Sequence, residues 1–198
     1  MKDSIFSKKR ILLLGSGELG KELVIESKRL GLEVIAIDRY ENAPAMQVAD
    51  YSNVIDMGDK NILKDIIKEF NPDFVVPEIE ALSIEALKEL EEEGFKIVPN
   101  ARTVEITMNR DKIRDLASNE LQIKTAKYNY VFDFNDLENK ALEIGFPLLL
   151  KPLMSSSGKG QSLVQCKENL LDSCNQALEN SRGKIVGVIL EQFIEFDY

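Results

Sequence analysis

A loop of small residues that carries lysine gives this chain its clearest chemical signal. An apolar run at 148–150 predicts a buried strand, Lys151 ends that strand, and the loop at 155–161 holds three serines, two glycines and Lys159. Free backbone N–H groups in such a loop can surround an anion, and the lysines add charge that follows the phosphates. Ordering so many small residues without a ligand is costly, which favours a lid over phosphates. The stretch predicts a polyphosphate site.

The loop differs from the common Walker A phosphate loop. That motif needs Gly-x-x-x-x-Gly-Lys followed by Ser or Thr. Here Leu153 stands where the first glycine belongs, and Gly160 stands where the hydroxyl residue belongs. Another apolar strand ends at residues 191–194, and its backbone edge could read the amino group and ring nitrogen of adenine. Arg110 is either a surface ion-pair residue or a further part of this site.

A glycine-rich turn near the N-terminus offers a second candidate site. Residues 15–20 satisfy Gly-x-Gly-x-x-Gly between a predicted strand and a helix, and Asp38 lies near the position of a ribose-binding acid, as in NAD sites. Glu18, however, would lie at the helix N-terminus and repel a pyrophosphate. Glu18 and Glu78 follow strands at the same sheet edge and could hold an amine. Three interpretations stay open: a plain glycine turn with solvated glutamates, an amine site, or a dinucleotide site.

Composition narrows the partners and the chemistry. The 198 residues carry a formal net charge of −9 and no histidine. An acidic surface argues against a nucleic acid or an anionic membrane as partner. Without histidine, imidazole catalysis and histidine-zinc sites are excluded, so carboxylates, lysines, arginines and a bound cofactor must supply the chemistry. Cys166 and Cys174 fit free thiols in a reducing cytoplasm, and we expect no signal peptide or membrane span.

Strand and helix patterns divide the chain into two regions. Over residues 1–120, short β-rich runs alternate with amphipathic helices, which predicts a doubly wound parallel sheet. The predicted strands there are 10–14, 33–37, 52–55, 73–76 and 96–98, and the helices are 18–30, 61–70, 83–93, 104–108 and 111–119. Residues 121–198 predict a smaller α+β unit. Its strands are 128–131, 148–151, 162–165 and 184–192, and its helices are 136–144 and 169–179.

Several segments in combination resemble the formate-dependent phosphoribosylglycinamide formyltransferases of purine synthesis, members of the ATP-grasp superfamily. These segments are residues 15–22, 38–40 with 42–46, 76–81, 108–110 and 151–161. The resemblance covers essentially the whole chain. It implies a Rossmann-like pre-ATP-grasp domain at 1–120 and the small ATP-grasp subdomain at 121–198, with the C-terminal ATP-grasp subdomain missing.

The resemblance also implies a reaction and its binding residues. ATP would phosphorylate formate, and the amine of glycinamide ribonucleotide would attack the formyl phosphate. Glycinamide ribonucleotide would bind at Glu18, Leu19 and Glu78. ATP would bind at Arg110, Lys151, Ser156, Ser157, Gly158, Lys159, Gly160, Gln161, Glu191, Gln192, Phe193 and Ile194. Magnesium would bridge the phosphates, with its ligands outside this chain.

The length of the chain departs from the family pattern. Family members are longer, and we expect their additional region to supply the magnesium carboxylates and the basic residues for the substrate phosphate. The sequence therefore predicts a truncated chain that is inactive alone, from a protein that forms homodimers at full length. Two alternatives are another ATP-grasp ligase, such as the ATP-dependent aminoimidazole ribonucleotide carboxylase subunit, and a non-catalytic nucleotide- or NAD-binding module.

Overall fold

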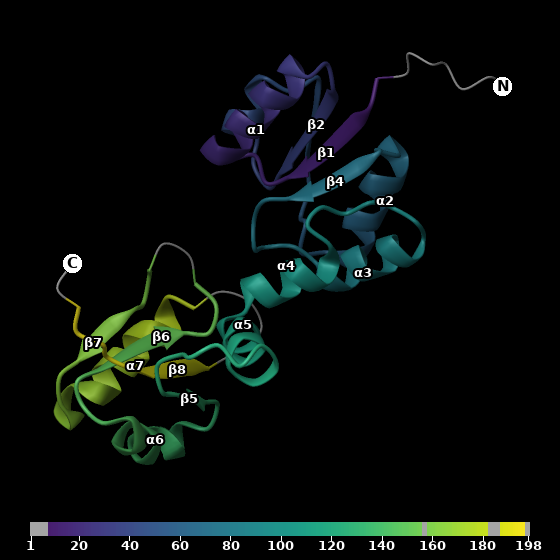
Figure 1. Cartoon of the computed structure of the whole chain (residues 1–198). Coiled ribbons are helices and arrows are strands. Elements are labelled where there is room, and N and C mark those ends of the chain that lie inside the picture. Colours follow the sequence, from purple (N-terminus) through teal and green to yellow (C-terminus); the bar gives the residue numbers. More distant parts are fainter. Residues whose placement is uncertain (1–7, 156–157, 182–186, 197–198) are drawn as a thin grey trace. The chain divides into compact units, whose positions relative to one another are not determined.

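The chain forms two compact units, each built around its own sheet. A computed structural model describes residues 8–155, 158–181 and 187–196 (Figure 1). The first unit is Met1–Glu105 and the second is Ile106–Tyr198.

The first unit contains a four-stranded parallel sheet. Its strands are β1 (Arg10–Leu14), β2 (Glu33–Asp38), β3 (Tyr51–Val54) and β4 (Phe74–Pro77), in the order β3-β2-β1-β4. β1 and β2 are near-continuous apolar runs whose central residues are fully buried, as expected for a sheet that is covered on both faces. The predicted doubly wound fold is confirmed.

Four α-helices accompany this sheet in the described part of the chain. They are α1 (Glu18–Arg29), α2 (Lys60–Phe70), α3 (Ile84–Glu92) and α4 (Ala101–Met108), and α4 continues into the second unit. Asp59 caps α2 by accepting from two backbone N–H groups, and Ser83 caps α3 as its sequence position predicts. A ladder of ion pairs joins the two helices. Its members are Lys60, Lys64 and Lys68 on α2 and Glu85, Glu89 and Glu93 in or just after α3.

The prediction of a strand at 96–98 is wrong, because the segment forms less than a strand. The structure has a single parallel bridge there, between Val75 and Ile97. The Val75 N–H donates to the Lys96 carbonyl at 2.8 Å, and the Val98 N–H donates to the Val75 carbonyl at 2.9 Å. The next residue of β4 that would donate toward this segment is Pro77, two positions after Val75, and it has no N–H, so the pairing ends after one bridge.

The second unit contains a four-stranded antiparallel sheet. Its strands are β5 (Tyr128–Val131), β6 (Leu148–Pro152), β7 (Ser162–Val164) and β8 (Val188–Gln192), in the order β5-β8-β6-β7. The predicted α+β organisation is therefore present. The last predicted strand, 184–192, is described from Val188 onward, and residues 182–186 lie outside the described part of the chain.

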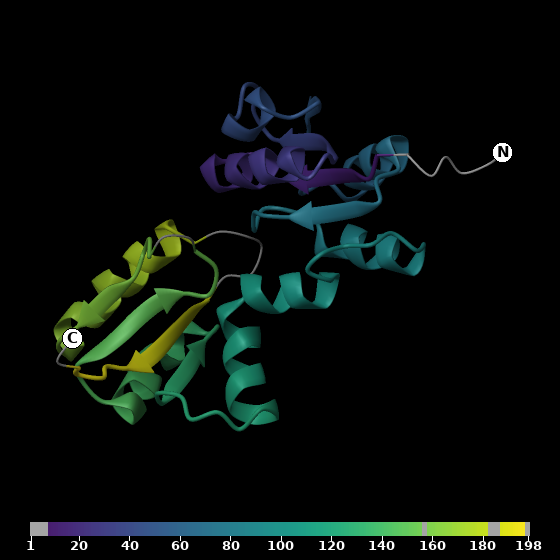
Figure 2. The same cartoon turned by 45° about the horizontal axis from the view of Figure 1, so that its top comes forward.

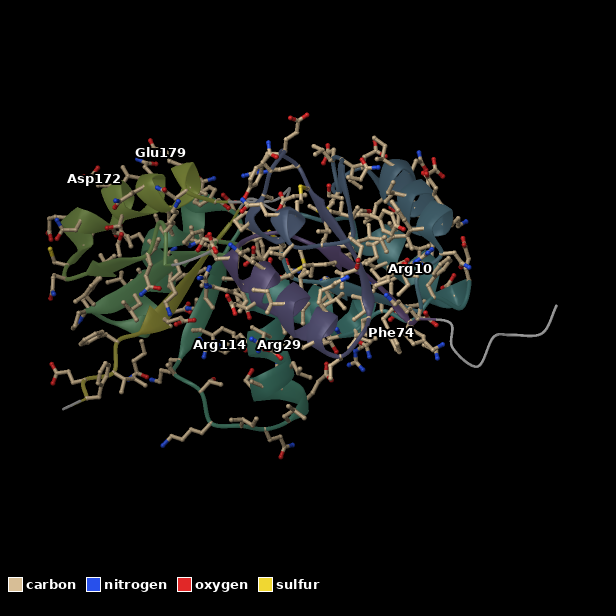
Figure 3. All side chains as sticks on the ribbon, turned by 90° about the horizontal axis from the view of Figure 1, so that it is seen from above. Arg10, Arg29, Phe74, Arg114, Asp172 and Glu179 are labelled. Atoms are coloured by element: carbon tan, nitrogen blue, oxygen red, sulfur yellow. The ribbon has the colours of Figure 1, made fainter. Side chains whose placement is uncertain are left out.

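Helices α6 (Leu137–Ile144) and α7 (Leu170–Glu179) pack on one face of this sheet (Figure 2). Alternate strand residues such as Leu148, Leu150 and Leu190 point into the core beneath them. Figure 3 shows Asp172 and Glu179 on the outer face of α7. Cys174, in the same helix, is buried. The helix is therefore amphipathic, with its charged side in solvent.

The opposite face of the sheet carries a short helical segment. The predicted helix 111–119 is α5 (Arg110–Asp115) followed by a π-helical turn, Leu116–Glu120. The Tyr130 hydroxyl lies 3.0 Å from the Asp111 carbonyl and 2.9 Å from Asp115 Oδ1, and the Tyr128 hydroxyl lies 3.0 Å from the same Asp115 oxygen. These contacts attach α5 to β5, so residues 106–120 pack with the second unit. The domain boundary at residue 120 stays a prediction.

Candidate functional site

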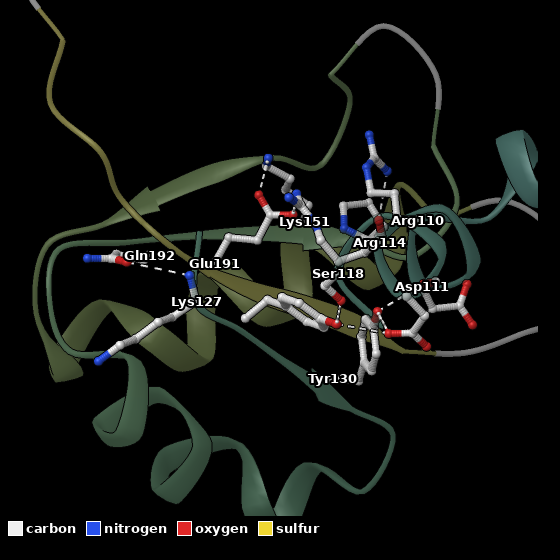
Figure 4. A network of polar contacts seen from close by, with 12 residues as sticks. Arg110, Asp111, Arg114, Ser118, Lys127, Tyr130, Lys151, Glu191 and Gln192 are labelled. Atoms are coloured by element: carbon white, nitrogen blue, oxygen red, sulfur yellow. Dashed lines mark hydrogen bonds and ion pairs between the residues drawn. The ribbon is translucent and has the colours of Figure 1, made fainter. Parts of the chain in front are cut away.

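A buried carboxylate between two cations lies at the centre of the first candidate site. Lys151 and Glu191 come from the adjacent strands β6 and β8 and lie on the face opposite the helix-covered core. Lys151 Nζ donates to Glu191 Oε2 at 2.6 Å, and Arg114 Nη2 donates to Glu191 Oε1 (Figure 4). The Glu191 side chain is only 7% exposed, so both of its oxygens are paired away from bulk water.

Arg110 ties α5 to the strand that leads into the lysine loop. Its Nη1 donates to the Pro152 carbonyl at 2.8 Å and to Ser155 Oγ at 2.9 Å, and its backbone N–H donates to the Leu153 carbonyl. Burial lowers the pKa of the Arg110 guanidinium, while the charge of Glu191 opposes that shift. A partly buried cation of this kind is stabilised by an anionic ligand.

These side chains line a cavity of about 350 Å³. Its lining residues are Arg110, Ile113, Arg114, Ala117, Lys151 and Glu191. Three cationic side chains face one carboxylate, so the cavity is locally positive in a chain whose net charge is −9. These side chains can therefore attract an anion, although the negative net charge of the whole chain repels it.

The lysine loop is described from its second half. Ser156 and Ser157 lie outside the described residues, and Gly158, Lys159 and Gly160 form a turn. The φ angles of Gly158 and Gly160 are +69° and +71°, a left-handed conformation that favours glycine. A Cβ at Gly160 would lie 2.9 Å from Asn180 Cβ, whereas a Cβ at Gly158 would meet nothing within 4 Å. The turn is therefore packed at Gly160 and open at Gly158, while Lys159 and Gln161 are exposed.

The candidate adenine edge, residues 191–194, spans the end of β8 and the two residues after it. Glu191 and Gln192 belong to β8, and Gln192 pairs with Leu148 on one side and donates its N–H to the Lys127 carbonyl on the other. Phe193 and Ile194 continue past the ladder, and the described residues give their backbone groups no hydrogen-bond partner. Any backbone contact with a base therefore centres on Phe193 and Ile194.

The second candidate site lies at the carboxyl edge of the parallel sheet. The chain runs from β1 outward to β2 and β3 and returns on the other side as β4, so the strand order reverses between β1 and β4. Doubly wound folds bind ligands outside the strand ends at such a point. Gly15 follows β1, Glu78 follows β4, and a Cβ on Gly15 would lie 2.7 Å from Glu78 Oε2. The Glu78 carboxylate thus rests against the glycine turn.

The electrostatics around Glu78 favour a cationic or hydrogen-donating ligand. Burial, together with the negative charges of Glu80 and Asp38, raises the pKa of Glu78. A cation or an N–H donor would relieve both effects. Glu18 and Leu19 open α1 at the same sheet edge and are exposed, Leu19 by 71%.

Asp38 serves the glycine turn itself. Its Oδ2 accepts the Ser16 N–H and its Oδ1 accepts the Arg39 N–H, each at 2.7 Å. The residue is 6% exposed. Both oxygens are thus engaged by the backbone, and the carboxylate holds the glycine turn in its conformation.

Arg114 is the charged cavity-lining residue that sequence reasoning missed. It lies four positions after Arg110 on the same helical segment, a spacing that places both side chains on one face. That spacing was the available signal. Its partner Glu191 is 77 positions away along the chain, which no local pattern reveals.

Two family models match this chain, one over most of each unit. Residues 8–108 match the family model of the ribonucleotide synthetase preATP-grasp domain, and residues 116–198 match that of the ATP-grasp domain. The chain belongs to the ribonucleotide synthetase preATP-grasp family. The expected ATP-grasp fold is confirmed.

Relatives of this preATP-grasp chain agree with the resemblance seen in its sequence. A curated relative from Prochlorococcus marinus (strain MIT 9301), named formate-dependent phosphoribosylglycinamide formyltransferase, is 82% identical over all of this chain and 51% of its own length. A solved structure titled glycinamide-RNase-transformylase T, from Mycobacterium tuberculosis, has a TM-score of 0.76 at 35% identity and covers 96% of this chain and 49% of that one. The preATP-grasp chain spans about half the length of the curated relatives it matches.

A third relative has a different name. The N5-carboxyaminoimidazole ribonucleotide synthetase from Thermotoga maritima has a TM-score of 0.76 at 28% identity. The match covers 96% of this chain and 47% of the synthetase chain.

Among the described residues, none of the helices combines the length and the apolar composition that a membrane span requires.

Proposed function

We propose that this chain takes part in the ATP-dependent formylation of glycinamide ribonucleotide with formate, as one half of a protein of its relatives' length. The observation that carries the proposal is the cationic cavity around Lys151 and Glu191 in a unit that matches the ATP-grasp domain. The Glu78 carboxylate at the strand-order reversal of the first unit adds a site suited to an amine.

In this proposal ATP places its phosphates at Lys151 and Arg110, under the turn formed by Gly158–Gln161. Phosphoryl transfer depends mainly on positioning and on neutralising the charge that develops on the transferred group. Lys151 and Arg110 supply positive charge, and the backbone N–H groups of the glycine turn supply donors. The backbone at Phe193 and Ile194 meets the edge of adenine.

Glycinamide ribonucleotide places its amine at Glu78 in this proposal. The amine nitrogen attacks the carbonyl carbon of formyl phosphate, and phosphate leaves with the electrons of the broken C–O bond. Glu78 orients the nitrogen by accepting its hydrogen bonds, and its raised pKa suits it to accept the proton that the nitrogen gives up. Glu18 and Leu19, exposed at the start of α1, complete the binding site in this proposal.

The described residues contain no group of three or more aspartate, glutamate or cysteine side chains placed to hold a metal ion. Glu191, the buried carboxylate of the cavity, already has both oxygens paired with cations. No step of the mechanism is therefore assigned to a magnesium ligand of this chain.

Calorimetric titration tests the amine site. Glycinamide ribonucleotide should bind the unsubstituted chain, and Glu78→Gln should bind it at least roughly tenfold more weakly, because the amide removes the charge. Glu26→Gln, at an exposed position of α1, is the matched control. Binding of NAD in place of glycinamide ribonucleotide would overturn the proposal. Formate-dependent release of phosphate from ATP, measured on the same samples, tests the expectation that the chain alone is inactive.

A second candidate is formation of N5-carboxyaminoimidazole ribonucleotide. The observation that favours it is that the two solved relatives, one a transformylase and one a synthetase, match this chain with the same TM-score. Competition between glycinamide ribonucleotide and aminoimidazole ribonucleotide separates the two candidates. Preferential binding of the aminoimidazole compound would favour the second.

A further inference from the structure

Arg114 occupies a position in the cavity that nothing in the loop motif explains. Its Nη2 donates to Glu191 Oε1, and its guanidinium carbon lies 5.8 Å from the centroid of the Tyr128 ring. Tyr128 stands directly opposite Glu191 in the register of β5 and β8. The aromatic ring and the carboxylate together hold the guanidinium in one place.

The Tyr128 side chain is itself anchored. Its hydroxyl lies 2.6 Å from Ser118 Oγ and 3.0 Å from Asp115 Oδ1, both in the segment that also carries Arg114. The ring and the helix that bears Arg114 are thus fixed to each other. Arg114 reaches Glu191 from a rigid support.

Glu191 needs both of its cations. Its side chain is 7% exposed, with Lys151 Nζ on Oε2 and Arg114 Nη2 on Oε1. A buried carboxylate that loses one partner leaves an oxygen unpaired and keeps much of its charge uncompensated. If Arg114 were absent, Lys151 would be the remaining cation bonded to Glu191. Its ammonium would then be held more firmly by the carboxylate.

We propose that Arg114 is a positioning residue for polyphosphate binding: it neutralises Glu191 and thereby leaves Lys151 able to direct its other donors into the cavity. The inference rests on the proposed function, which places the ATP phosphates there. An ammonium group carries three donors, and Glu191 accepts one of them. Arg114 acts through Glu191 and makes no contact with the phosphates.

A double-mutant cycle measured by calorimetry tests this role. The full 198-residue chain, Arg114→Gln, Glu191→Gln and the double variant are each titrated with inorganic tripolyphosphate. Arg114→Gln should weaken binding roughly tenfold in the unsubstituted chain. In the Glu191→Gln background, where no carboxylate needs neutralising, the same change should weaken binding by no more than about threefold.

Conservative and control variants complete the experiment. Arg114→Lys keeps the charge beside Glu191 and should bind within about threefold of the unsubstituted chain. Arg29→Gln removes one positive charge from an exposed ion pair on α1 and should leave the affinity unchanged. Circular dichroism checks that each variant is folded. If Arg114→Gln unfolds, Arg114→Lys and the double variant still carry the comparison, since neither leaves the Glu191 carboxylate without its second cation.

The possible outcomes separate this inference from the proposed function. An equal loss of affinity from Arg114→Gln in both backgrounds would show direct contact with the phosphates and overturn the positioning role, leaving the proposed function intact. A failure of Arg114→Lys to preserve binding would also overturn the role. If the unsubstituted chain bound no tripolyphosphate, the placement of phosphates in this cavity would fall, and the ATP part of the proposed function with it.

Discussion

Gly160 packs directly against Asn180, at the end of α7. A Cβ at Gly160 would lie 2.9 Å from Asn180 Cβ and 3.1 Å from Pro152 Cγ. The turn of the lysine loop is therefore fixed to the body of the second unit at this one glycine. Gly158, two positions earlier, has nearly the same φ angle and open space around it.

Alanine at the two glycines should separate backbone strain from packing. Gly158→Ala forces a residue with a Cβ into the left-handed region and should cost about 1 kcal/mol of unfolding free energy. Gly160→Ala adds overpacking against Asn180 and Pro152 and should cost about 3 kcal/mol. Urea unfolding followed by circular dichroism measures both. Equal losses would contradict the close packing at Gly160.

Alanine at Gly15 should damage the amine site. Its φ is +109°, and a Cβ there would meet the Glu78 carboxylate and Ile79 Cγ2, so the turn or Glu78 must move. We expect the affinity for glycinamide ribonucleotide to fall roughly tenfold or more. Gly17→Ala, where a Cβ meets nothing within 4 Å, is the control, and titration calorimetry compares the two. An affinity that falls equally in both variants would count against the contact between Gly15 and Glu78.

The ladder between α2 and α3 should give the first unit an acid-sensitive stability. Lys60 and Lys64 lower the pKa of Glu89 from 4.5 to about 2. Because the folded pKa is depressed, the stabilisation is fully present above pH 4.5 and is lost as the pH falls toward 2. Glu89→Gln should flatten the dependence of the unfolding temperature on pH within this window. The pairs are exposed, so the effect is modest and shrinks with added salt.

Differential scanning fluorimetry over that pH range measures the effect. Glu26→Gln, which breaks a lone exposed pair with Arg29, serves as the control. An unchanged acid dependence in Glu89→Gln would show that the pairs of Glu89 with Lys60 and Lys64 contribute nothing to folding.

Replacing Asp38 should loosen the glycine turn. Its two oxygens accept the N–H groups of Ser16 and Arg39, and an amide can accept only through its one oxygen. Asp38→Asn should therefore cost about 2 kcal/mol of unfolding free energy, measured by urea titration. Asp172→Asn, on the exposed side of α7, should cost less than about 0.5 kcal/mol. A loss no larger than that of the Asp172 variant would mean that the turn holds without the carboxylate.

Local patterns predicted most of the elements, because apolar periodicity and caps act over a few residues. β1 and β5 begin and end where the sequence places them, and Ser83 caps α3 as predicted. The segment 96–98 has the apolar character of a strand, but the neighbouring strand β4 has Pro77 where the next N–H of the ladder would stand.

The site was predictable in its residue types and less so in its pairings. Lys151 and the glycine turn are contiguous in sequence, so their chemistry could be read directly. The ion pair of Arg114 with Glu191, and the use of both Asp38 oxygens by the backbone, depend on which distant segments the fold brings together. No spacing rule encodes such contacts.

The strand order β5-β8-β6-β7 gives the second unit a defined sequence of assembly. β8 is the last strand among the described residues, yet it lies between β5 and β6 and is hydrogen-bonded to both. Until β8 enters, β5 has no neighbour, so during synthesis on the ribosome the sheet closes only after its final strand has emerged. The first unit, whose strands all precede residue 78, can fold earlier. Nascent chains halted before Val188 should therefore show a folded first unit and an open, chaperone-accessible second one.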